Sequence, residues 1–99
     1  MIKEGPNPSF LGAFNANAAY GDDLDNYIKT CKKRDNFTNY SHNPWYSSHA
    51  MWGLLIVINI DYYSSLQMIF SESTSENWYR HRYDGVWHTW FYLNLNPHS

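Results

Sequence analysis

Residues 77–93 read NWYRHRYDGVWHTWFYL, an aromatic-rich stretch with Asp84-Gly85 at its middle. Asp-Gly between two alternating aromatic runs is typical of a two-residue β-hairpin turn, because both central residues of a type I′ turn need positive φ. Polar and aromatic side chains fall on both sides of the resulting ribbon, so both of its faces can pack against other groups. The stretch therefore predicts a hairpin that is part of a larger β-structure.

A two-residue turn also determines which residues of the two strands face each other. We predict Arg82 opposite Trp87, where a cation–π contact is worth roughly 0.5–1 kcal/mol. Continued outward without interruption, the same register places Tyr79 opposite Trp90. It also places Trp78 opposite Phe91.

His81 and His88 face each other in this register, which raises the question of a metal ion. Zinc needs three or four ligands, and no third ligand follows from the sequence. The ordinary interpretation, two half-buried or solvated histidines, is favoured. Three such histidines would meet only on the axis of a trimer.

Composition limits the classes of function. The chain of 99 residues predicts one domain, and its net charge of −2 with no basic stripe argues against a nucleic-acid partner. The basic run 32–34 is interpreted as a solvated loop or helix end. Cys31 is the only cysteine, which excludes an internal disulfide. The apolar run 52–60 is far shorter than a membrane-spanning helix, so no membrane insertion is expected.

Nineteen aromatic side chains (five Trp, nine Tyr and five Phe) are the strongest compositional feature. Each buries roughly 150–250 Å² when covered. One small domain is not expected to hide all of them, so we predict that some lie in a subunit interface or on a binding face.

Residues 51–60 form the clearest strand, with apolar residues on both faces, which predicts a central, covered strand. Residues 61–65 are predicted as a turn and residues 66–71 as a second strand, with Leu66, Met68 and Phe70 facing inward. Together with the hairpin, these strands predict a four-stranded meander over residues 51–93.

Residues 22–34 carry apolar residues at helical spacing, with acids at the front and bases at the back, which suits a helix dipole. We predict one short helix near residues 23–33. Asp22, Asp23 and Asp25 also resemble the start of a calcium loop. The further ligands and the glycine of such a loop are missing, so no metal and no cofactor are expected.

The order of motifs in the second half is similar to that of a known family. The stretches are WGLLIV (52–57), LQMIF (66–70), WYRHR (78–82), DGVW (84–87) and WFYL (90–93). They resemble the pyocin-knob type of domain found near the C-termini of bacteriophage tail-fibre and tailocin proteins. Asp23-Leu24-Asp25 is similar to the D-L-N with which such domains often begin, so the resemblance covers residues 23–93.

The resemblance implies a mainly β fold, a small antiparallel sheet or sandwich knob, assembled as a homotrimer. Residues 1–22 would be a lead-in from a fibre shaft or a short accessory strand around Phe10–Phe14. Residues 23–94 would be the knob and residues 95–99 a frayed tail. The motif residues are then framework positions: Trp52, Gly53, Gln67, Arg80, Arg82, Gly85, Trp87, Trp90 and Leu93.

The resemblance further implies a receptor-binding tip on an extracellular virion fibre, which docks on a host bacterial surface glycan or protein. Pyranose rings stack on Tyr and Trp while polar neighbours bind their hydroxyls. The long loop 35–50 and the turn 61–65 are the segments with the fewest framework positions. The candidate ligand-binding residues are Tyr40, His42, Trp45, Tyr46, Tyr62 and Tyr63.

Two other interpretations stay open. A purely structural trimerisation or capping module of a virion fibre would use the same aromatics at subunit contacts. A small glycan-acting enzyme would need two carboxylates on opposite sides of one bond. The acids here lie mostly in loops, and no Gly-x-Ser-x-Gly motif occurs, so we expect no catalytic residue.

Overall fold

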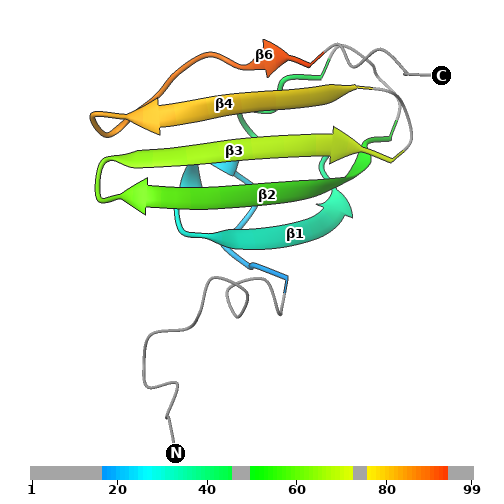
Figure 1. Ribbon diagram of the computed structural model, residues 1–99. Helices are drawn as coiled ribbons and strands as arrows, with labels where there is room; N and C mark the ends of the chain where they lie inside the picture. Colours follow the sequence, from blue (N-terminus) through cyan, green and yellow to red (C-terminus); the bar gives the residue numbers. More distant parts are fainter. Residues whose placement is uncertain (1–16, 46–49, 73–75, 94–99) are drawn as a thin grey trace, which may run out of the picture.

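The computed structural model describes residues 17–45, 50–72 and 76–93, and these form one antiparallel sheet (Figure 1). Its strands run in the order β1-β2-β3-β4, and β5 and β6 both pair with β4. Their bounds are β1 (Cys31–Asn36), β2 (Trp52–Asp61), β3 (Ser64–Ser71), β4 (Asn77–Tyr83), β5 (Val86–Trp87) and β6 (Phe91–Tyr92). The predictions of a mainly β fold and of a meander over residues 51–93 are confirmed.

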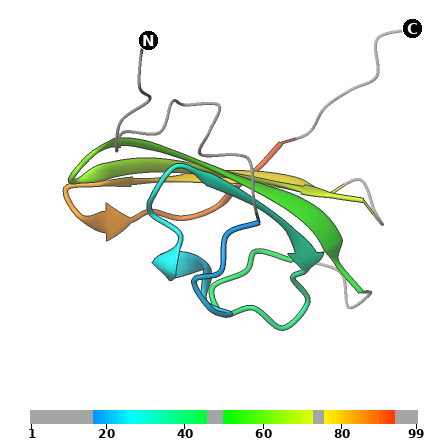
Figure 2. The ribbon, with the colours of Figure 1, turned by 90° about the horizontal axis from the view of Figure 1, so that it is seen from below.

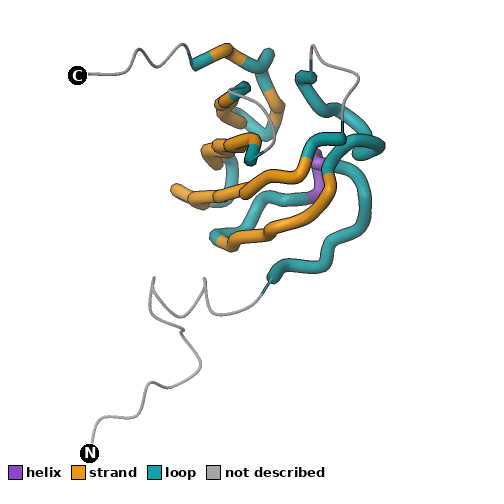
Figure 3. Tube along the Cα trace, turned by 90° about the vertical axis from the view of Figure 1, so that its right-hand side faces the viewer, coloured by secondary structure: helices purple, strands orange, loops and turns teal. Residues whose placement is uncertain are grey.

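One face of the sheet is covered by residues 17–30 and 37–45, here called the loop layer, which lie beneath it (Figure 2). This layer contains a single 3₁₀ turn, η2 (Leu24–Asn26), and is otherwise irregular (Figure 3). The core lies between the loop layer and this covered face. Its buried apolar residues are Leu24, Tyr27, Cys31, Phe37, Tyr40, Leu55, Val57, Ile69 and Trp78.

The side chains of β3 point the opposite way from the prediction. Ser65, Gln67 and Ile69 are buried on the covered face, whereas Leu66 and Met68, like Phe70, lie half-buried on the other side of the sheet, here called the open face. Apolar residues are expected on the inner face because buried side chains are normally apolar. Gln67 replaces them because its amide finds hydrogen-bond partners on the covered face, which removes the cost of burying it.

The helix predicted near residues 23–33 is wrong beyond its first turn. A helix would use the carbonyls of its first residues for its own i to i+4 bonds. Here the carbonyls of Leu24 and Tyr27 accept from Gln67 Nε2 at 2.7 and 2.9 Å, and the carbonyl of Ile28 accepts from Ser65 Oγ at 2.8 Å. The sheet thus takes up the groups that would propagate the helix, and β1 begins at Cys31.

The hairpin turn is confirmed. Asp84 and Gly85 have φ values of 55° and 76°, as a type I′ turn requires. Arg82 pairs with Trp87, as predicted, and Tyr83 pairs with Val86 next to the turn. The next pair is also present: His88 N donates to the carbonyl of His81 at 2.9 Å, and the two rings stack at 5.3 Å.

Beyond His88 the predicted register is wrong by one residue. Tyr79 pairs with Phe91 and Trp78 with Tyr92, rather than with Trp90 and Phe91. One extra residue is therefore accommodated between β5 and β6, in residues 88–90. An inserted residue reverses the facing of the residues after it, so the ring of Trp90 reaches the covered side instead of the open face.

The outer edge of β1 is closed by Asn17 and Ala18, the first two described residues of the loop layer. Ala18 N donates to the carbonyl of Lys32 at 2.8 Å. The side chain of Asn17 bonds both the amide and the carbonyl of Arg34, at 3.4 and 3.5 Å. The predicted accessory strand at residues 10–14 and the tail at 95–99 lie outside the described residues. In the described part of the chain, no helix is long and apolar enough to cross a membrane.

Candidate functional site

Arg80 is the centre of a polar cluster on the covered face. It lies on β4 opposite Gln67 of β3 and is only 3% exposed. Its Nε donates to Gln67 Oε1 at 2.8 Å, while Nε2 of the same amide bonds the loop layer. Gln67 therefore links the sheet, the arginine and residues 24–27, because one side chain both accepts and donates.

The guanidinium of Arg80 lies between two tryptophans. Its Cζ is 4.2 Å from the ring centroid of Trp87 and 4.5 Å from that of Trp90. The cation–π partner of Trp87 is therefore Arg80, not Arg82 as predicted from direct pairing. Arg82 instead donates from Nη1 to the carbonyl of Tyr62 at 3.2 Å.

The extra residue in 88–90 makes this double stacking possible, because it turns Trp90 toward Arg80. Both indoles are held by hydrogen bonds to the loop layer: Trp87 Nε1 donates to the carbonyl of Asp25 at 3.1 Å, and Trp90 Nε1 donates to that of His42 at 2.8 Å. Burial lowers the pKa of Arg80, and its ion pair with Asp25, Nη1 to Oδ1 at 2.9 Å, opposes that shift.

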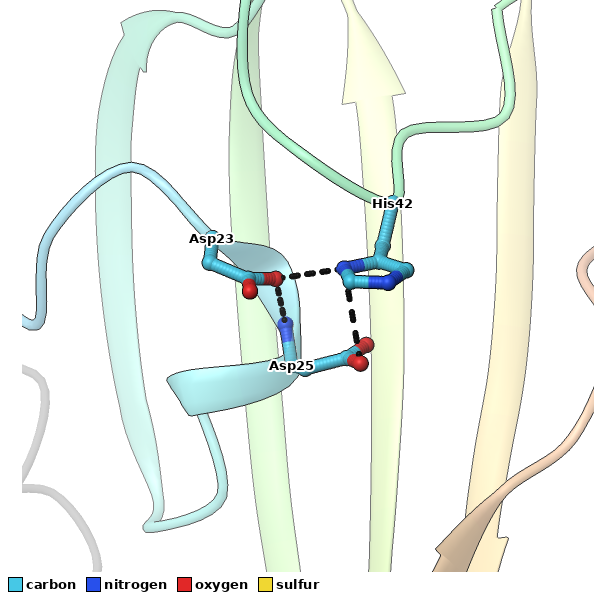
Figure 4. Close-up of side chains that lie close together, drawn as sticks. All are labelled: Asp23, Asp25 and His42. Atoms are coloured by element: carbon cyan, nitrogen blue, oxygen red, sulfur yellow. Dashed lines mark hydrogen bonds and ion pairs between the residues drawn. The ribbon is translucent and has the colours of Figure 1, made fainter.

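Asp23, Asp25 and His42 converge beside this arginine (Figure 4). His42 Nδ1 lies 2.7 Å from Asp23 Oδ1 and 3.4 Å from Asp25 Oδ2. Asp23 also caps η2, accepting from the amide of Asp25 at 2.9 Å. The hydrogen bond from this amide, followed by the bond to His42, lowers the pKa of the Asp23 carboxyl.

One ligand atom from each of these three residues lies within 4.8 Å of the others, close enough for all three to hold one metal ion. The charge of Arg80 already balances Asp25, however, and Asp23 already accepts a hydrogen bond from the amide of Asp25. Because its pKa is lowered, the carboxylate of Asp23 can accept hydrogen bonds but is poorly suited to act as a general acid, which needs a raised pKa. Chemically, the cluster can accept hydrogen bonds through its carboxylates and can present the outer nitrogen of His42.

The structure separates the candidate residues of the long loop. Tyr40 is 6% exposed, and its hydroxyl donates to Asp35 Oδ2 at 2.7 Å. Trp45 is half-buried against the core, and its Nε1 donates to the carbonyl of Phe37 at 3.1 Å. His42 is exposed, in the cluster just described, and Tyr46 lies outside the described residues.

Tyr62 and Tyr63 occupy the two-residue turn between β2 and β3. They are 82% and 56% exposed, and their rings meet edge to face at 4.8 Å. The turn is held internally, because Tyr63 N donates to Asp61 Oδ1 at 2.8 Å. Both rings are thus presented to solvent from a fixed backbone.

The β4–β5 turn lies beside this one. Gly85 N donates to the carbonyl of Tyr63 at 3.1 Å, and the bond from Arg82 to Tyr62 is a second tie. Nine large apolar side chains are exposed in the described residues, and five of them lie on or next to these two turns. We call this surface the tyrosine end; its residues are Ile60, Tyr62, Tyr63, Tyr83 and Val86.

Sequence reasoning found two of the five residues of the tyrosine end and missed the others. Tyr83 and Val86 flank the Asp84-Gly85 turn, which was recognisable, but their nearness to Tyr62 follows from strand order. The cluster around Arg80 was missed as a unit, because Asp25, Gln67 and Trp90 are distant in sequence. The resemblance named Gln67, Arg80, Trp87 and Trp90 as motif positions, but it did not place them together.

Comparisons with known proteins add no relative: no family model, no curated protein and no solved structure matches this chain.

Proposed function

We propose that this chain is a knob domain of a bacteriophage tail fibre, of the pyocin-knob type, that attaches the virion to a glycan on the host bacterial surface. It acts by binding and carries out no catalysis. Several copies on one fibre, three in the arrangement implied by the resemblance, would turn modest affinity per site into firm attachment.

The placement of the motif residues supports the family. Positions far apart in sequence that carry the resemblance meet in one network: Gln67 bonds Arg80, Arg80 pairs with Asp25, and Trp87 and Trp90 enclose the guanidinium. A shared framework is expected to use its characteristic residues in this way, because a buried arginine needs every one of these partners.

The tyrosine end is the observation that carries the proposed attachment. Exposed apolar side chains scattered singly need no explanation, but a group of them marks a binding surface. Here five gather on two turns that are tied together by hydrogen bonds. Tyrosine has few rotatable bonds and combines an apolar ring with a polar hydroxyl, which suits the faces and hydroxyls of a sugar.

Polar groups stand next to these rings. Asp61 and Asp84 are exposed in the two turns, and Arg82 is half-exposed between them. Carboxylates accept from sugar hydroxyls, and a guanidinium donates to them. The tyrosine end thus offers both kinds of contact that a glycan requires, which favours a glycan over a purely apolar partner.

The test is adsorption of the purified chain to a panel of bacterial cells and to arrayed bacterial glycans. We expect Tyr62→Ala with Tyr63→Ala to weaken binding about tenfold or more, because loss of an aromatic anchor typically costs over 1 kcal/mol. The matched control is Tyr20→Ala, a tyrosine of 41% exposure elsewhere on the molecule. Circular dichroism checks that each variant is folded.

Two results would count against the proposal. Unchanged adsorption of the folded double variant would exclude the tyrosine end. Failure of the wild-type chain to bind any cell or glycan, together with a trimer in light scattering, would favour the structural capping module instead.

A further inference from the structure

A polar pocket of about 290 Å³ lies where the end of β1 meets the loop layer. Every side chain that lines it carries a hydrogen-bonding group: Asp22, Asp35, Asn36, Asn39 and Tyr40. Tyr40 is buried, Asp35 and Asn36 are half-buried, and Asp22 and Asn39 are exposed. The pocket therefore has a buried inner wall and an open rim.

The inner wall is held in place by hydrogen bonds. Asp35 Oδ1 accepts from the amide of Asn36 at 2.8 Å, and Oδ2 accepts from the hydroxyl of Tyr40 at 2.7 Å. Asn36 Oδ1 in turn accepts from the amide and the hydroxyl of Thr38. The bond from Tyr40 is the main cause of the lowered pKa of Asp35, so this carboxylate is ionised at neutral pH.

These groups keep hydrogen-bonding capacity for a ligand. Because Asn36 is anchored through Oδ1, the two N–H groups of its Nδ2 are left to donate. A carboxylate has roughly four acceptor sites, so Asp35 can accept further bonds. In the part of the chain that the structure describes, the carboxylate of Asp22 and the side-chain amide of Asn39 make no hydrogen bond.

The lining disfavours other classes of ligand. Two carboxylates repel an anion, and the nearby Lys33 is already engaged, with Nζ 3.9 Å from Asp35 Oδ2 and donating to the carbonyl of Ala18 at 2.7 Å. No aliphatic side chain of the described residues lines the pocket, so an apolar ligand gains little. A bare metal ion would leave most of the space to water, since one water takes up roughly 30 Å³.

We propose that this pocket binds one neutral sugar ring through its hydroxyls. A hydroxyl is both donor and acceptor, so neighbouring hydroxyls can donate to the carboxylates of Asp22 and Asp35 and accept from the amides of Asn36 and Asn39. Ligand pockets typically measure roughly 300 Å³ or more, so this volume suits one ring rather than several. The open rim leaves room for the rest of a glycan chain to extend into solvent.

The pocket is separate from the tyrosine end. Asn36 pairs with Trp52, the first residue of β2, whereas Tyr62 follows the last residue of that strand (Figure 1). β2 has 10 residues, and a strand rises roughly 3.3 Å per residue, so roughly 30 Å separates its two ends. One sugar ring cannot reach both places. The proposal therefore goes beyond attachment through the tyrosine end and does not depend on it.

Nuclear magnetic resonance of the isotope-labelled full chain tests the proposal. The probes are glucose, galactose, mannose and N-acetylglucosamine, each titrated into the tens of millimolar because one sugar is a small ligand. We expect at least one of them to shift the side-chain amide signals of Asn36 and Asn39. A methyl glycoside of that sugar shows whether the site also takes the end unit of a chain; binding of the free sugar alone or of both supports the proposal.

Variants at the rim provide the second measurement. We expect Asp22→Ala with Asn39→Ala to weaken the best sugar about tenfold or more, because bonds to a charged and a neutral group are both lost. The control Asn26→Ala, an exposed asparagine outside the pocket, should bind as the wild type does. Absence of shifts at Asn36 and Asn39 with every sugar, shifts only at the tyrosine end, or shifts with calcium chloride but no sugar would overturn the proposal. Shifts only at the tyrosine end would leave the proposed attachment intact.

Discussion

Arg80 and Gln67 face each other on neighbouring strands and share a hydrogen bond of 2.8 Å in the middle of the covered face. Both side chains are almost fully buried. An arginine in such a position needs a planar set of donors, because Nε bonds Gln67 while Nη1 pairs with Asp25. A lysine at the same place would keep the charge but could not make both contacts.

We therefore predict that Arg80→Lys lowers the free energy of unfolding by roughly 2–4 kcal/mol, because a buried network loses a partner and both tryptophans lose a stacked plane. Urea denaturation measures the change. The control is Arg34→Lys, whose exposed pair with Glu72 should be worth less than about 1 kcal/mol. Equal losses in the two variants would contradict the central role of Arg80.

Gly53 and Gly85 are both needed, for different reasons. A Cβ on Gly53 would lie 2.7 Å from the backbone carbonyl oxygen of Phe70, so the strands would have to move. A Cβ on Gly85 meets nothing closer than 3.9 Å, and only its φ of 76° disfavours a side chain. We predict that Gly53→Ala costs roughly 1–3 kcal/mol and Gly85→Ala roughly 1–2 kcal/mol.

Asparagine separates the two causes. Because Asn tolerates positive φ, Gly85→Asn should recover most of the stability lost in Gly85→Ala, whereas Gly53→Asn should be worse than Gly53→Ala. Thermal or urea unfolding of the four variants checks this order, and recovery at both positions would refute the steric argument for Gly53.

The lowered pKa of Asp23 predicts that the protein loses stability in acid. Its carboxyl has a pKa below the ordinary value of 3.8, chiefly because the amide of Asp25 donates to it. Stability from this group is therefore present above about pH 4 and is lost as the pH falls through the lowered pKa. We expect Asp23→Ala to cost roughly 1 kcal/mol at pH 7, as the loss of a helix cap does, and to flatten the pH dependence below pH 4.

The matched variant is Asp23→Asn, which keeps a cap acceptor but loses the charge. It should lose less stability at neutral pH than Asp23→Ala while showing the same flattened acid profile. Unfolding curves at several pH values between 2 and 7 provide the test. An unchanged acid slope in both variants would show that other carboxyls, such as Asp35, dominate.

The raised pKa of Tyr40 predicts that the protein loses stability in alkali. Burial, together with the bond to Asp35, raises its pKa above the ordinary 10.0. As the pH rises, the unfolded chain therefore loses the phenolic proton of this tyrosine before the folded chain does. The contribution of Tyr40 to the free energy of unfolding is fully present below pH 10 and falls above it, by up to about 1.4 kcal/mol per pH unit for one group. We expect Tyr40→Phe to be less stable at pH 7 but to lose less as the pH rises from 10 to 11.5.

Cys31 has to be removed from this measurement, because burial raises its pKa to about 11 and its effect has the same sign. The comparison is therefore made in a Cys31→Ala background. Tyr62→Phe serves as the control, since its ring is 82% exposed. Should Tyr40→Phe retain the full alkaline slope, the assignment to Tyr40 is wrong.

Local signals in the sequence predicted local structure well. The Asp84-Gly85 turn and its first pairs follow from the φ values that the turn requires, and the β2 strand follows from its apolar run. The extra residue in 88–90 could not be predicted, because it depends on residues that are distant in sequence. The ring of Trp90 stacks on Arg80, and its Nε1 donates to the carbonyl of His42.

The error over residues 23–33 has the same physical origin. Helical spacing places Leu24, Tyr27 and Cys31 on one side of the chain, and all three do enter the core. They enter it from a turn, a loop and a strand, because Gln67 and Ser65 bind the carbonyls that a helix would use. Of the candidate ligand residues that the structure describes, His42, Tyr62 and Tyr63 are exposed, and Tyr40 is held in the core by its bond to Asp35.

The contact of Asn17 with β1 has a consequence for aggregation. The outer strand of a sheet offers unpaired amides and carbonyls to which another chain can add as an extra strand. Asn17 occupies both groups of Arg34 with a single side chain, and Ala18 takes the carbonyl of Lys32. This edge is thus closed to strand addition, so copies held close together cannot join into a continuous β-structure through β1.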